Sequence, residues 1–273
     1  MSQIRLLSRF GLSALSAGLL LALLGLLLGQ TDPTHAALIE DGKGPELLIG
    51  FDDDNQTNAL IQAGAVANQS LNRTDVLDGG RGNDVMFGLN GNDVMNGGPG
   101  DDIILGGPDG GPAPGGPPNS DIMFGGQGND VNVWAPGDGS EAFIGGPGID
   151  AIVFGATDLE VDPVTGARLP DLFFGVPEFP QGIPTANVSG LGNFCTVEPS
   201  PSPGYEQLVR FRSAATTNII VTVRVKDVEQ VFCTDQSGGS IAFADLTIPL
   251  PAFVPVTQQD VATLNPLVGA MIR

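Results

Sequence analysis

The sequence predicts an all-β protein in which a parallel β-roll precedes a small β-rich C-terminal region. Two observations lead to this fold class. Residues 77–154 repeat every nine positions, and each repeat sets glycines ahead of an aspartate. Downstream, residues 208–212 and 219–226 alternate apolar and polar side chains, which is the period of a half-buried strand.

The nonapeptide follows the pattern G-G-x-G-x-D-x-U-x, in which U is a large apolar residue. Its copies are GGRGNDVMF (79–87), GLNGNDVMN (88–96), GGPGDDIIL (97–105), GGQGNDVNV (125–133) and GGPGIDAIV (145–153). The first six residues form a turn, where glycine is needed because the chain bends sharply and visits positive φ. The last three form a short strand whose central side chain points inward.

Turn and strand alternate, so the chain winds into a flattened coil with two repeats in each circuit. Repeats two apart then stack on the same edge. A single repeat cannot bury its apolar residue, so the stack must form together. The interior positions are Met86, Met95, Ile104, Met123, Asn132 and Ile152, of which only Asn132 is polar.

This pattern resembles the RTX, or haemolysin-type, calcium-binding nonapeptide repeat over roughly a third of the chain. The resemblance implies a β-roll with Ca²⁺ as its cofactor. Calcium takes about six to eight hard oxygen ligands. Stacked turns expose backbone carbonyls and each adds one carboxylate, so two turns can enclose one ion. A lone Gly-Asn-Asp would indicate only a turn, but three contiguous copies at a fixed period and two more downstream favour calcium binding.

The predicted ligands are the sixth-position aspartates together with turn residues that offer backbone oxygens. The full set is Asp75, Gly79, Arg81, Asp84, Gly88, Asn90, Asp93, Gly97, Pro99, Asp102, Asp121, Asp130 and Asp150. The turns 79–84 and 97–102 are complete and form the best predicted site.

The register also predicts which carboxylates stack. On one edge Asp84 lies over Asp102, and Asp102 lies over Asp121. On the other edge Asp75 lies under Asp93.

Residues 106–124 interrupt the array. They read as two degenerate repeats plus one extra residue, so that Gly111 or Pro112 falls where an aspartate is expected, and the register returns at Asp121. Such defects indicate loops that bulge from one edge of the roll.

A second interruption, 134–144, is two residues too long and offers Glu141 in the ligand position. Asp130 and Asp150 form a further pair if this stretch loops out.

Charge supports a divalent cation and excludes nucleic acid. The chain has 31 acidic and 11 basic residues, whereas phosphate binding needs clustered lysine and arginine. Without a cation the stacked carboxylates would repel one another. With a cation the repulsion becomes ligation, so the free energy of metal binding becomes free energy of folding.

The chain divides into four parts. Residues 1–36 are the predicted signal peptide, 37–69 an entry segment with one degenerate repeat, 70–154 the roll, and 155–273 the C-terminal region. The degenerate repeat, DGKGPELLI (41–49), has glutamate in place of aspartate.

The N-terminus is typical of an export signal. Arg5 and Arg9 precede an apolar run, 12–28, and Thr34-His35-Ala36 forms a small-x-small cleavage pattern. We expect cleavage after Ala36, an extracellular or cell-surface protein, and no membrane span in the mature chain. The alternative is an uncleaved membrane anchor, because the run is close to the length that spans a bilayer.

Cys195 and Cys233 are the only cysteines, and an even pair in an exported chain suggests one disulfide. Two free thiols are the alternative. RTX proteins more often leave through a dedicated exporter that reads a C-terminal signal, and they tend to lack cysteines. The leader and the cysteine pair instead favour the general secretory route, which weakens any carryover of toxin or protease activity.

The C-terminal region begins with a proline-punctuated connection, 155–206. Two strands, at 208–212 and 219–225, are expected to form a hairpin through 213–218, with a third strand within 240–248 and a short helix at 257–265. The basic residues of the hairpin, Arg210, Arg212, Arg224 and Lys226, are expected on one face. That face is either solvated or docks the acidic roll or an anionic wall polymer.

Few catalytic chemistries fit this sequence. His35 is the only histidine and lies in the leader, so a cleaved protein lacks the Ser-His-Asp and Cys-His catalysts and histidine-ligated zinc. We expect no enzyme but an exported calcium-binding protein with a structural or adhesive role, with a cell-surface or matrix polymer as candidate partner. The alternatives are a secreted enzyme acting on polysaccharides or esters through an unrecognised site, and a toxin-like factor.

Overall fold

The computed structural model describes residues 76–88, 92–107, 120–157, 171–188, 192–237 and 239–272 with their side chains. It also describes the backbone of the strands at 38–40, 47–49, 159–161 and 168–170. The predicted signal peptide and the predicted ligands Asp75 and Asn90 lie outside the described residues.

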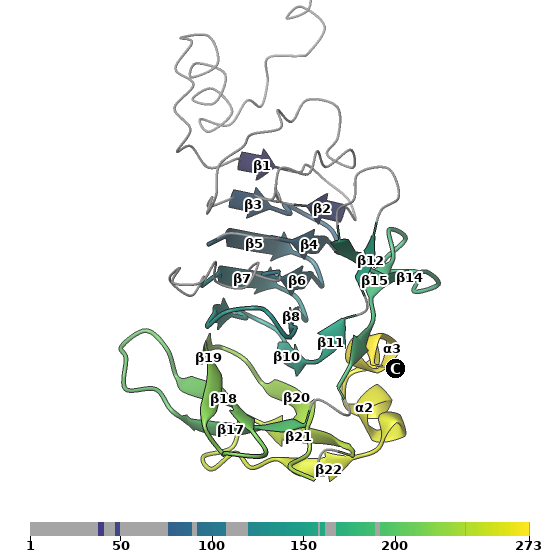
Figure 1. Ribbon diagram of the computed structural model, residues 1–273. Helices are drawn as coiled ribbons and strands as arrows, with labels where there is room; N and C mark the ends of the chain where they lie inside the picture. Colours follow the sequence, from purple (N-terminus) through teal and green to yellow (C-terminus); the bar gives the residue numbers. More distant parts are fainter. Residues whose placement is uncertain are drawn as a thin grey trace, which may run out of the picture.

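Two long sheets run along the molecule and contain most of the described strands (Figure 1). The first sheet has the order β1 (Leu38–Glu40), β3 (Val76–Asp78), β5 (Val94–Pro99), β7 (Ile122–Gln127), β9 (Ala142–Ile144), β19 (Ile219–Lys226), β18 (Gln207–Ser213) and β17 (Asn193–Pro199). The second has the order β2 (Leu47–Ile49), β4 (Val85–Phe87), β6 (Ile103–Leu105), β8 (Val131–Trp134), β10 (Ala151–Phe154), β20 (Gln230–Thr234), β21 (Ile241–Asp245) and β22 (Val254–Val256).

The chain alternates between the two sheets, so the predicted parallel β-roll is confirmed. Successive strands β3 to β10 fall in the first and second sheet in turn, and neighbours within each sheet pair in parallel. The repeats hold their register: Met86 lies beside Ile104, and Met95 beside Met123. In the degenerate repeat 41–49, Leu48 occupies the equivalent position beside Met86.

The interior positions form one continuous apolar column between the sheets. Met86, Met95, Ile104, Met123 and Ile152 are fully buried in one hydrophobic cluster. Asn132 is also fully buried, and its side-chain amide donates hydrogen bonds to the Ile104 carbonyl and the Met123 sulfur. Its carbonyl oxygen has no partner, so this position carries the cost of a buried polar atom.

The stretch 106–124 does not hold two repeats, contrary to our expectation. β7 follows it and pairs with β5, Ile122 beside Val94, so the chain has advanced by a single repeat. Between Gly107 and Ser120, the described residues on either side of the stretch, the register therefore advances by one repeat. Because the chain passes only one edge of the coil there, Asp121 lies on the opposite edge from Asp102.

The C-terminal strands extend the roll in place of forming a sheet of their own. β19 pairs in parallel with β9, and β20 with β10. Beyond this junction both sheets become antiparallel, through β18 and β17 in one and β21 and β22 in the other. The expected hairpin is present as β18 and β19, and the expected third strand as β21. We refer to residues 193–256 as the cap.

The predicted disulfide forms between Cys195 and Cys233, whose Cα atoms are 6.1 Å apart. Cys195 lies in β17 of the first sheet and Cys233 in β20 of the second. The bond therefore fastens the two sheets to each other inside the cap.

The connection at 155–188 is more regular than expected. It forms three short antiparallel pairs: β11 (Ala156–Thr157) with β16 (Ala186–Asn187), β12 (Leu159–Val161) with β13 (Arg168–Pro170), and β14 (Leu172–Phe173) with β15 (Ile183–Pro184). This segment packs on the outer face of the second sheet, where Phe179 and Ile183 join the cluster that contains Phe87 and Val131.

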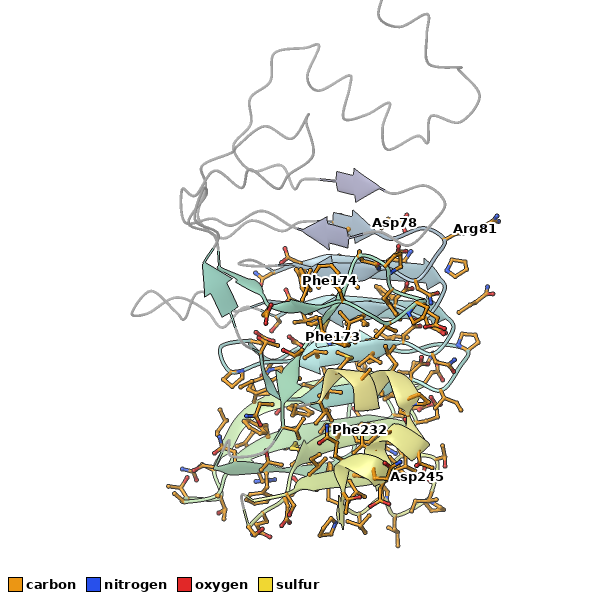
Figure 2. All side chains as sticks on the ribbon, turned by 90° about the vertical axis from the view of Figure 1, so that its right-hand side faces the viewer. Asp78, Arg81, Phe173, Phe174, Phe232 and Asp245 are labelled. Carbon is orange, nitrogen blue, oxygen red and sulfur yellow. A yellow bond between two sulfur atoms is a disulfide. The ribbon has the colours of Figure 1, made fainter. Side chains whose placement is uncertain are left out.

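Two helices complete the cover of the second sheet, beside Phe232 in Figure 2. The expected helix is α2 (Gln258–Leu264), whose first turn is closed by a capping box of Thr257 and Asp260. Asn265 then caps α3 (Pro266–Met271). Within the part of the chain that the structure describes, no helix is both long and apolar enough to cross a membrane.

Candidate metal centre

Four repeat turns stack along one edge of the roll, which we call the first edge. They contribute Asp84, Asp102, Asp130 and Asp150, all fully buried. Each aspartate amide donates to the Oδ1 of the next aspartate: Asp84 to Asp102, Asp102 to Asp130 and Asp130 to Asp150, each at 2.8 Å. The predicted pairs Asp84–Asp102 and Asp130–Asp150 are both present, and Asp130 takes the place that we had assigned to Asp121.

The opposite, second edge holds Asp93, Asp121 and Glu141, which are also buried. The Asp93 amide donates to Asp121 Oδ1 at 2.7 Å. Asp121 therefore stacks on Asp93, and our placement of it over Asp102 was wrong. Glu141 stands where the sequence placed it, because the Ala142 amide donates to the Asp121 carbonyl.

Within each turn the remaining carboxylate oxygen converges on a carbonyl of the next turn. A Cβ atom added to Gly79 would lie 2.8 Å from Asp84 Oδ2 and 2.7 Å from the Gly97 carbonyl oxygen. The corresponding carbon on Gly97 would meet Asp102 Oδ2 and the carbonyl of Gly125. The first glycine of the repeat is thus required because any side chain would fill the space between these two oxygens.

The stacking also brings the turns too close for side chains at the second glycine. A Cβ atom on Gly98 would overlap the Gly80 carbonyl oxygen, and Gly98 has a φ of +102°. Glycine is therefore needed at this position for both conformation and space.

Three of these carboxylates carry a buried oxygen that has no hydrogen-bond partner. These oxygens are the Oδ2 atoms of Asp102, Asp130 and Asp150. A buried carboxylate oxygen without a partner is costly unless a cation or a proton compensates it. Each points into the space that a carbonyl of the following turn also faces.

The pKa values of these groups show the cost of holding the charge. Burial raises the pKa of Asp102 to about 7, although the hydrogen bond from the Asp84 amide lowers it. Burial likewise raises the pKa of Asp130 to about 8 and that of Asp150 to about 7. A bound cation would favour the ionised forms.

These oxygens fit calcium. Carboxylate and backbone carbonyl oxygens are the ligands that Ca²⁺ takes in proteins. Among the described residues no three acidic, histidine or cysteine side chains gather as a metal-binding group. A cation on either edge would thus be held by one or two carboxylates with carbonyls supplying the remaining protein ligands.

The predicted turn residues divide into two kinds. Gly79, Gly88 and Gly97 each line a cradle between a carboxylate and a carbonyl. Arg81 and Pro99 occupy the exposed third position, and Figure 2 shows Arg81 pointing away from the roll. The Pro99 carbonyl accepts the Gly82 amide at 3.0 Å.

Sequence reasoning missed Gly106, Gly125 and Gly145. The carbonyls of these glycines face the cradles of Gly88, Gly97 and Gly125. Each is the first glycine of its turn, as Gly79 is, so the repeat pattern alone would have been enough to predict them.

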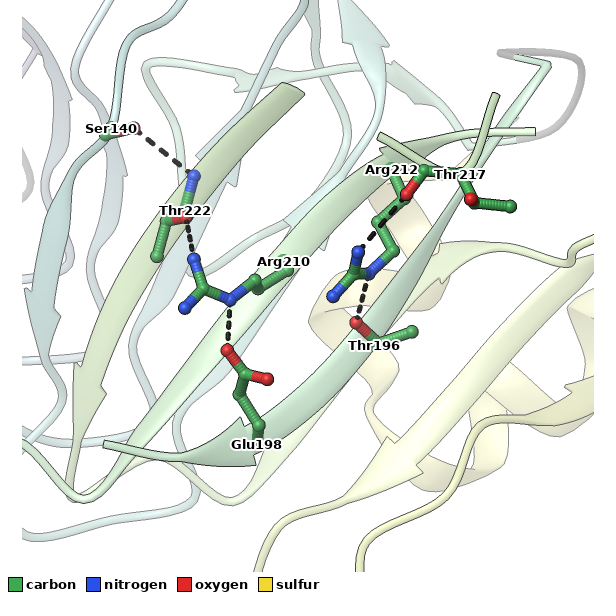
Figure 3. A network of polar contacts seen from close by, with 7 residues as sticks. All are labelled: Ser140, Thr196, Glu198, Arg210, Arg212, Thr217 and Thr222. Carbon is green, nitrogen blue, oxygen red and sulfur yellow. Dashed lines mark hydrogen bonds and ion pairs between the residues drawn. The ribbon is translucent and has the colours of Figure 1, made fainter. Parts of the chain in front are cut away.

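Basic residues of the cap make hydrogen bonds to neighbouring strands and turns of the cap, as Figure 3 shows for Arg210 and Arg212. Arg210 pairs with Glu198 and donates to Thr222, while Arg212 donates to Thr196 and the Thr217 carbonyl. Arg224 lies over the Tyr205 ring, 5.7 Å from its centroid. These side-chain contacts lie within the cap, and docking to the acidic roll or to an anionic polymer stays a prediction.

Comparison with known proteins agrees with this geometry. Residues 71–107 and 119–131 match the RTX calcium-binding nonapeptide repeat, in four copies. Comparisons with curated proteins and with solved structures returned no match. Residues 71–131 of the roll therefore contain RTX repeats, and the cation that such repeats bind is calcium.

Proposed function

We propose that this calcium-binding protein is an exported structural or adhesive element whose roll is held together by Ca²⁺ outside the cell. The observation that carries the proposal is the column of buried aspartates on the first edge, three of which have a carboxylate oxygen without a hydrogen-bond partner. Without a cation, the ionised carboxylates of such a column repel one another. A bound divalent cation offsets that cost.

Three further features support an extracellular setting. Extracellular modules commonly bind calcium at about 10⁻⁴–10⁻³ M, so a roll of this kind is loaded outside cells and loose inside them. Disulfides persist in oxidising compartments, and the cap contains one. RTX repeat proteins are typically secreted.

A structural or adhesive role fits the use of the acids in this fold. The buried aspartates lie in a regular column and accept backbone amides from their neighbours. The outer face of the first sheet remains accessible, with Ile122 and Phe124 each 39% exposed. This face is a candidate contact surface for a polymer.

Circular dichroism of the mature chain with and without a calcium chelator tests the calcium dependence. Calcium should increase the β signal, because the ionised carboxylates stack only around the metal. Magnesium at the same concentration serves as the control and should not reproduce the change, since Mg²⁺ demands strict octahedral geometry. Identical spectra with and without calcium would refute the proposal.

Location and role need separate measurements. Fractionation of producing cells should recover the protein outside the membrane, and N-terminal sequencing should find it starting after Ala36. Sedimentation with purified cell-wall or matrix polymer should require calcium. Recovery of the protein inside the cell would exclude this role, whereas turnover of polysaccharide or ester substrates would establish the enzymatic alternative. Calcium-dependent leakage of liposomes would instead indicate a toxin-like factor.

A further inference from the structure

The first edge does not end at the last repeat. The turn 145–150 is followed by a non-repeat turn, 227–229, that leads into β20. Gly146 donates to the Asp227 carbonyl at 3.3 Å, and Gln230 donates to the Asp150 carbonyl at 3.0 Å. Gly126 and Ala151 make the same two bonds one circuit earlier, to the carbonyls of Gly145 and Asp130. The turn 227–229 thus stands where the next repeat turn would stand.

The oxygens of a repeat site recur at this junction. The Asp150 amide donates to Glu229 Oε2 at 2.7 Å, as the Asp130 amide does to Asp150 Oδ1. A Cβ atom added to Gly145 would overlap both Asp150 Oδ2 and the Asp227 carbonyl oxygen. This is the arrangement of carboxylate and carbonyl that lines every complete cradle of the first edge.

The junction also contains a buried polar atom that the protein leaves unsatisfied. Asp150 is fully buried, and its Oδ2 has no hydrogen-bond partner. This oxygen shares the space beside Gly145 with the Asp227 carbonyl. A ligand with positive charge would satisfy it, and among the described residues the two ion pairs, Arg210–Glu198 and Lys226–Asp227, do not involve Asp150.

The sequence of the turn shows how a shorter segment can replace a repeat. Asp227, Val228 and Glu229 take the place of six residues, and the extra methylene of glutamate lets its carboxylate reach the Asp150 amide. Asp227 has a φ of +50°, a left-handed conformation that aspartate tolerates better than most residues. Its side chain forms an ion pair with Lys226 at 3.3 Å. Its backbone carbonyl faces the space beside Gly145.

We propose that the turns 145–150 and 227–229 together bind a further Ca²⁺, held by Asp150, the Asp227 carbonyl and Glu229. The site lies outside residues 71–131, where the repeat match is found. It rests on calcium binding by the roll and extends it: the metal would fasten the last repeat to the cap.

Calorimetric titration of calcium into the full mature chain tests the site with Glu229→Gln. Glutamine can still accept the Asp150 amide, so the fold is kept while one charge is removed. One calcium ion should bind at least about tenfold more weakly, because charged ligands set calcium affinity. The matched control is Glu178→Gln, which removes the same charge from an exposed residue and should bind calcium like the unaltered protein.

Hydrogen exchange locates the effect. At the calcium concentration that saturates the unaltered protein, exchange in the peptide 226–234 should quicken in Glu229→Gln and remain unchanged around Asp84. Equal affinity and stoichiometry in Glu229→Gln would overturn the further site while leaving the repeat sites intact. Failure of the unaltered protein to bind any calcium would overturn the proposed function itself.

The site can also be tested in the unaltered protein, without any substitution. A crystal structure with calcium should show anomalous density between Asp150 and the Asp227 carbonyl, and density confined to the repeat turns would overturn the proposal.

Discussion

At the scale of single residues, the repeated aspartate does two things with its two oxygens. Oδ1 accepts the amide of the preceding turn and fixes the stack, and Oδ2 faces the space that a metal would occupy. Glutamate can replace aspartate as the acceptor, as Glu229 does for the Asp150 amide. The carboxylate therefore has two roles: it stacks one turn on the next, and it supplies negative charge for the metal.

Replacing Asp84 and Asp102 together by asparagine should lower the number of bound calcium ions by at least one. Asparagine keeps an oxygen that accepts the neighbouring amide, so the change acts mainly on charge. Calorimetric stoichiometry measures the loss. The paired control is Asp171→Asn with Glu178→Gln, which removes two charges from exposed positions; a loss of the same size there would contradict the stacking register.

Acidity should act in opposite directions on the empty and the loaded roll. The folded pKa values of Asp102, Asp130 and Asp150, about 7 to 8, exceed the value of 3.8 for the unfolded chain. The folded protein therefore binds more protons, and without calcium its free energy of unfolding should fall as the pH rises from about 4 to about 8. Calcium affinity should rise over the same interval because the metal binds the ionised forms.

Urea denaturation of metal-free protein at a series of pH values, with calorimetry alongside, measures both effects. A calcium-free stability that increases with pH would show that these carboxylates are already compensated in the folded state.

At the scale of the elements, the turns fix the spacing of the roll. The glycines at the second and fourth positions of a turn approach the turn before them so closely that no side chain fits. Gly98 over Gly80 and Gly100 over Gly82 are two such contacts. The turns therefore hold a fixed spacing along the edge of the roll.

Gly98→Ala should lower the free energy of unfolding by about 2 kcal/mol or more, because the added carbon meets backbone and the φ is unfavourable. Gly239→Ala is the control, since no atom lies within 4 Å of the added carbon there. Thermal unfolding of the calcium-loaded proteins provides the comparison. Equal melting temperatures would mean that the turns can separate at little cost.

How much of these elements the sequence predicts depends on whether the repeat is complete. The register of 79–105 follows from the nine-residue period. The ligand position of Glu141 is predictable because the stretch 134–144 is only two residues longer than one repeat. The insertion before Asp121 could not be placed in this way, since its length fits either one or two passes of the coil. Only the pairing of β7 with β5 decides between the edges.

At the scale of the whole molecule, the roll and the cap share both sheets. Three strands of the cap, β18, β19 and β21, are predictable from the sequence, but their attachment to the roll is not. The contact of β9 with β19 joins 142–144 to 224–226, and neither strand carries the nonapeptide. Glu229 escaped notice for the same reason, because its role appears only once β20 lies beside β10.

Removing the disulfide should destabilise the molecule without changing how many calcium ions it binds. The bond closes a loop with a sequence separation of 38 residues, for which chain entropy predicts a loss of about 4 kcal/mol. Cys195→Ala with Cys233→Ala, compared with the unaltered protein by urea denaturation in calcium, measures this loss. If the folded double variant bound fewer calcium ions, the disulfide would also be needed for the conformation of the repeat turns.

The position of the disulfide has a consequence for the order of assembly. It joins β17 to β20, and β20 is the strand that pairs with the last repeat strand, β10. A coil that nucleates at this junction would grow from the repeat beside the cap toward the N-terminal repeats.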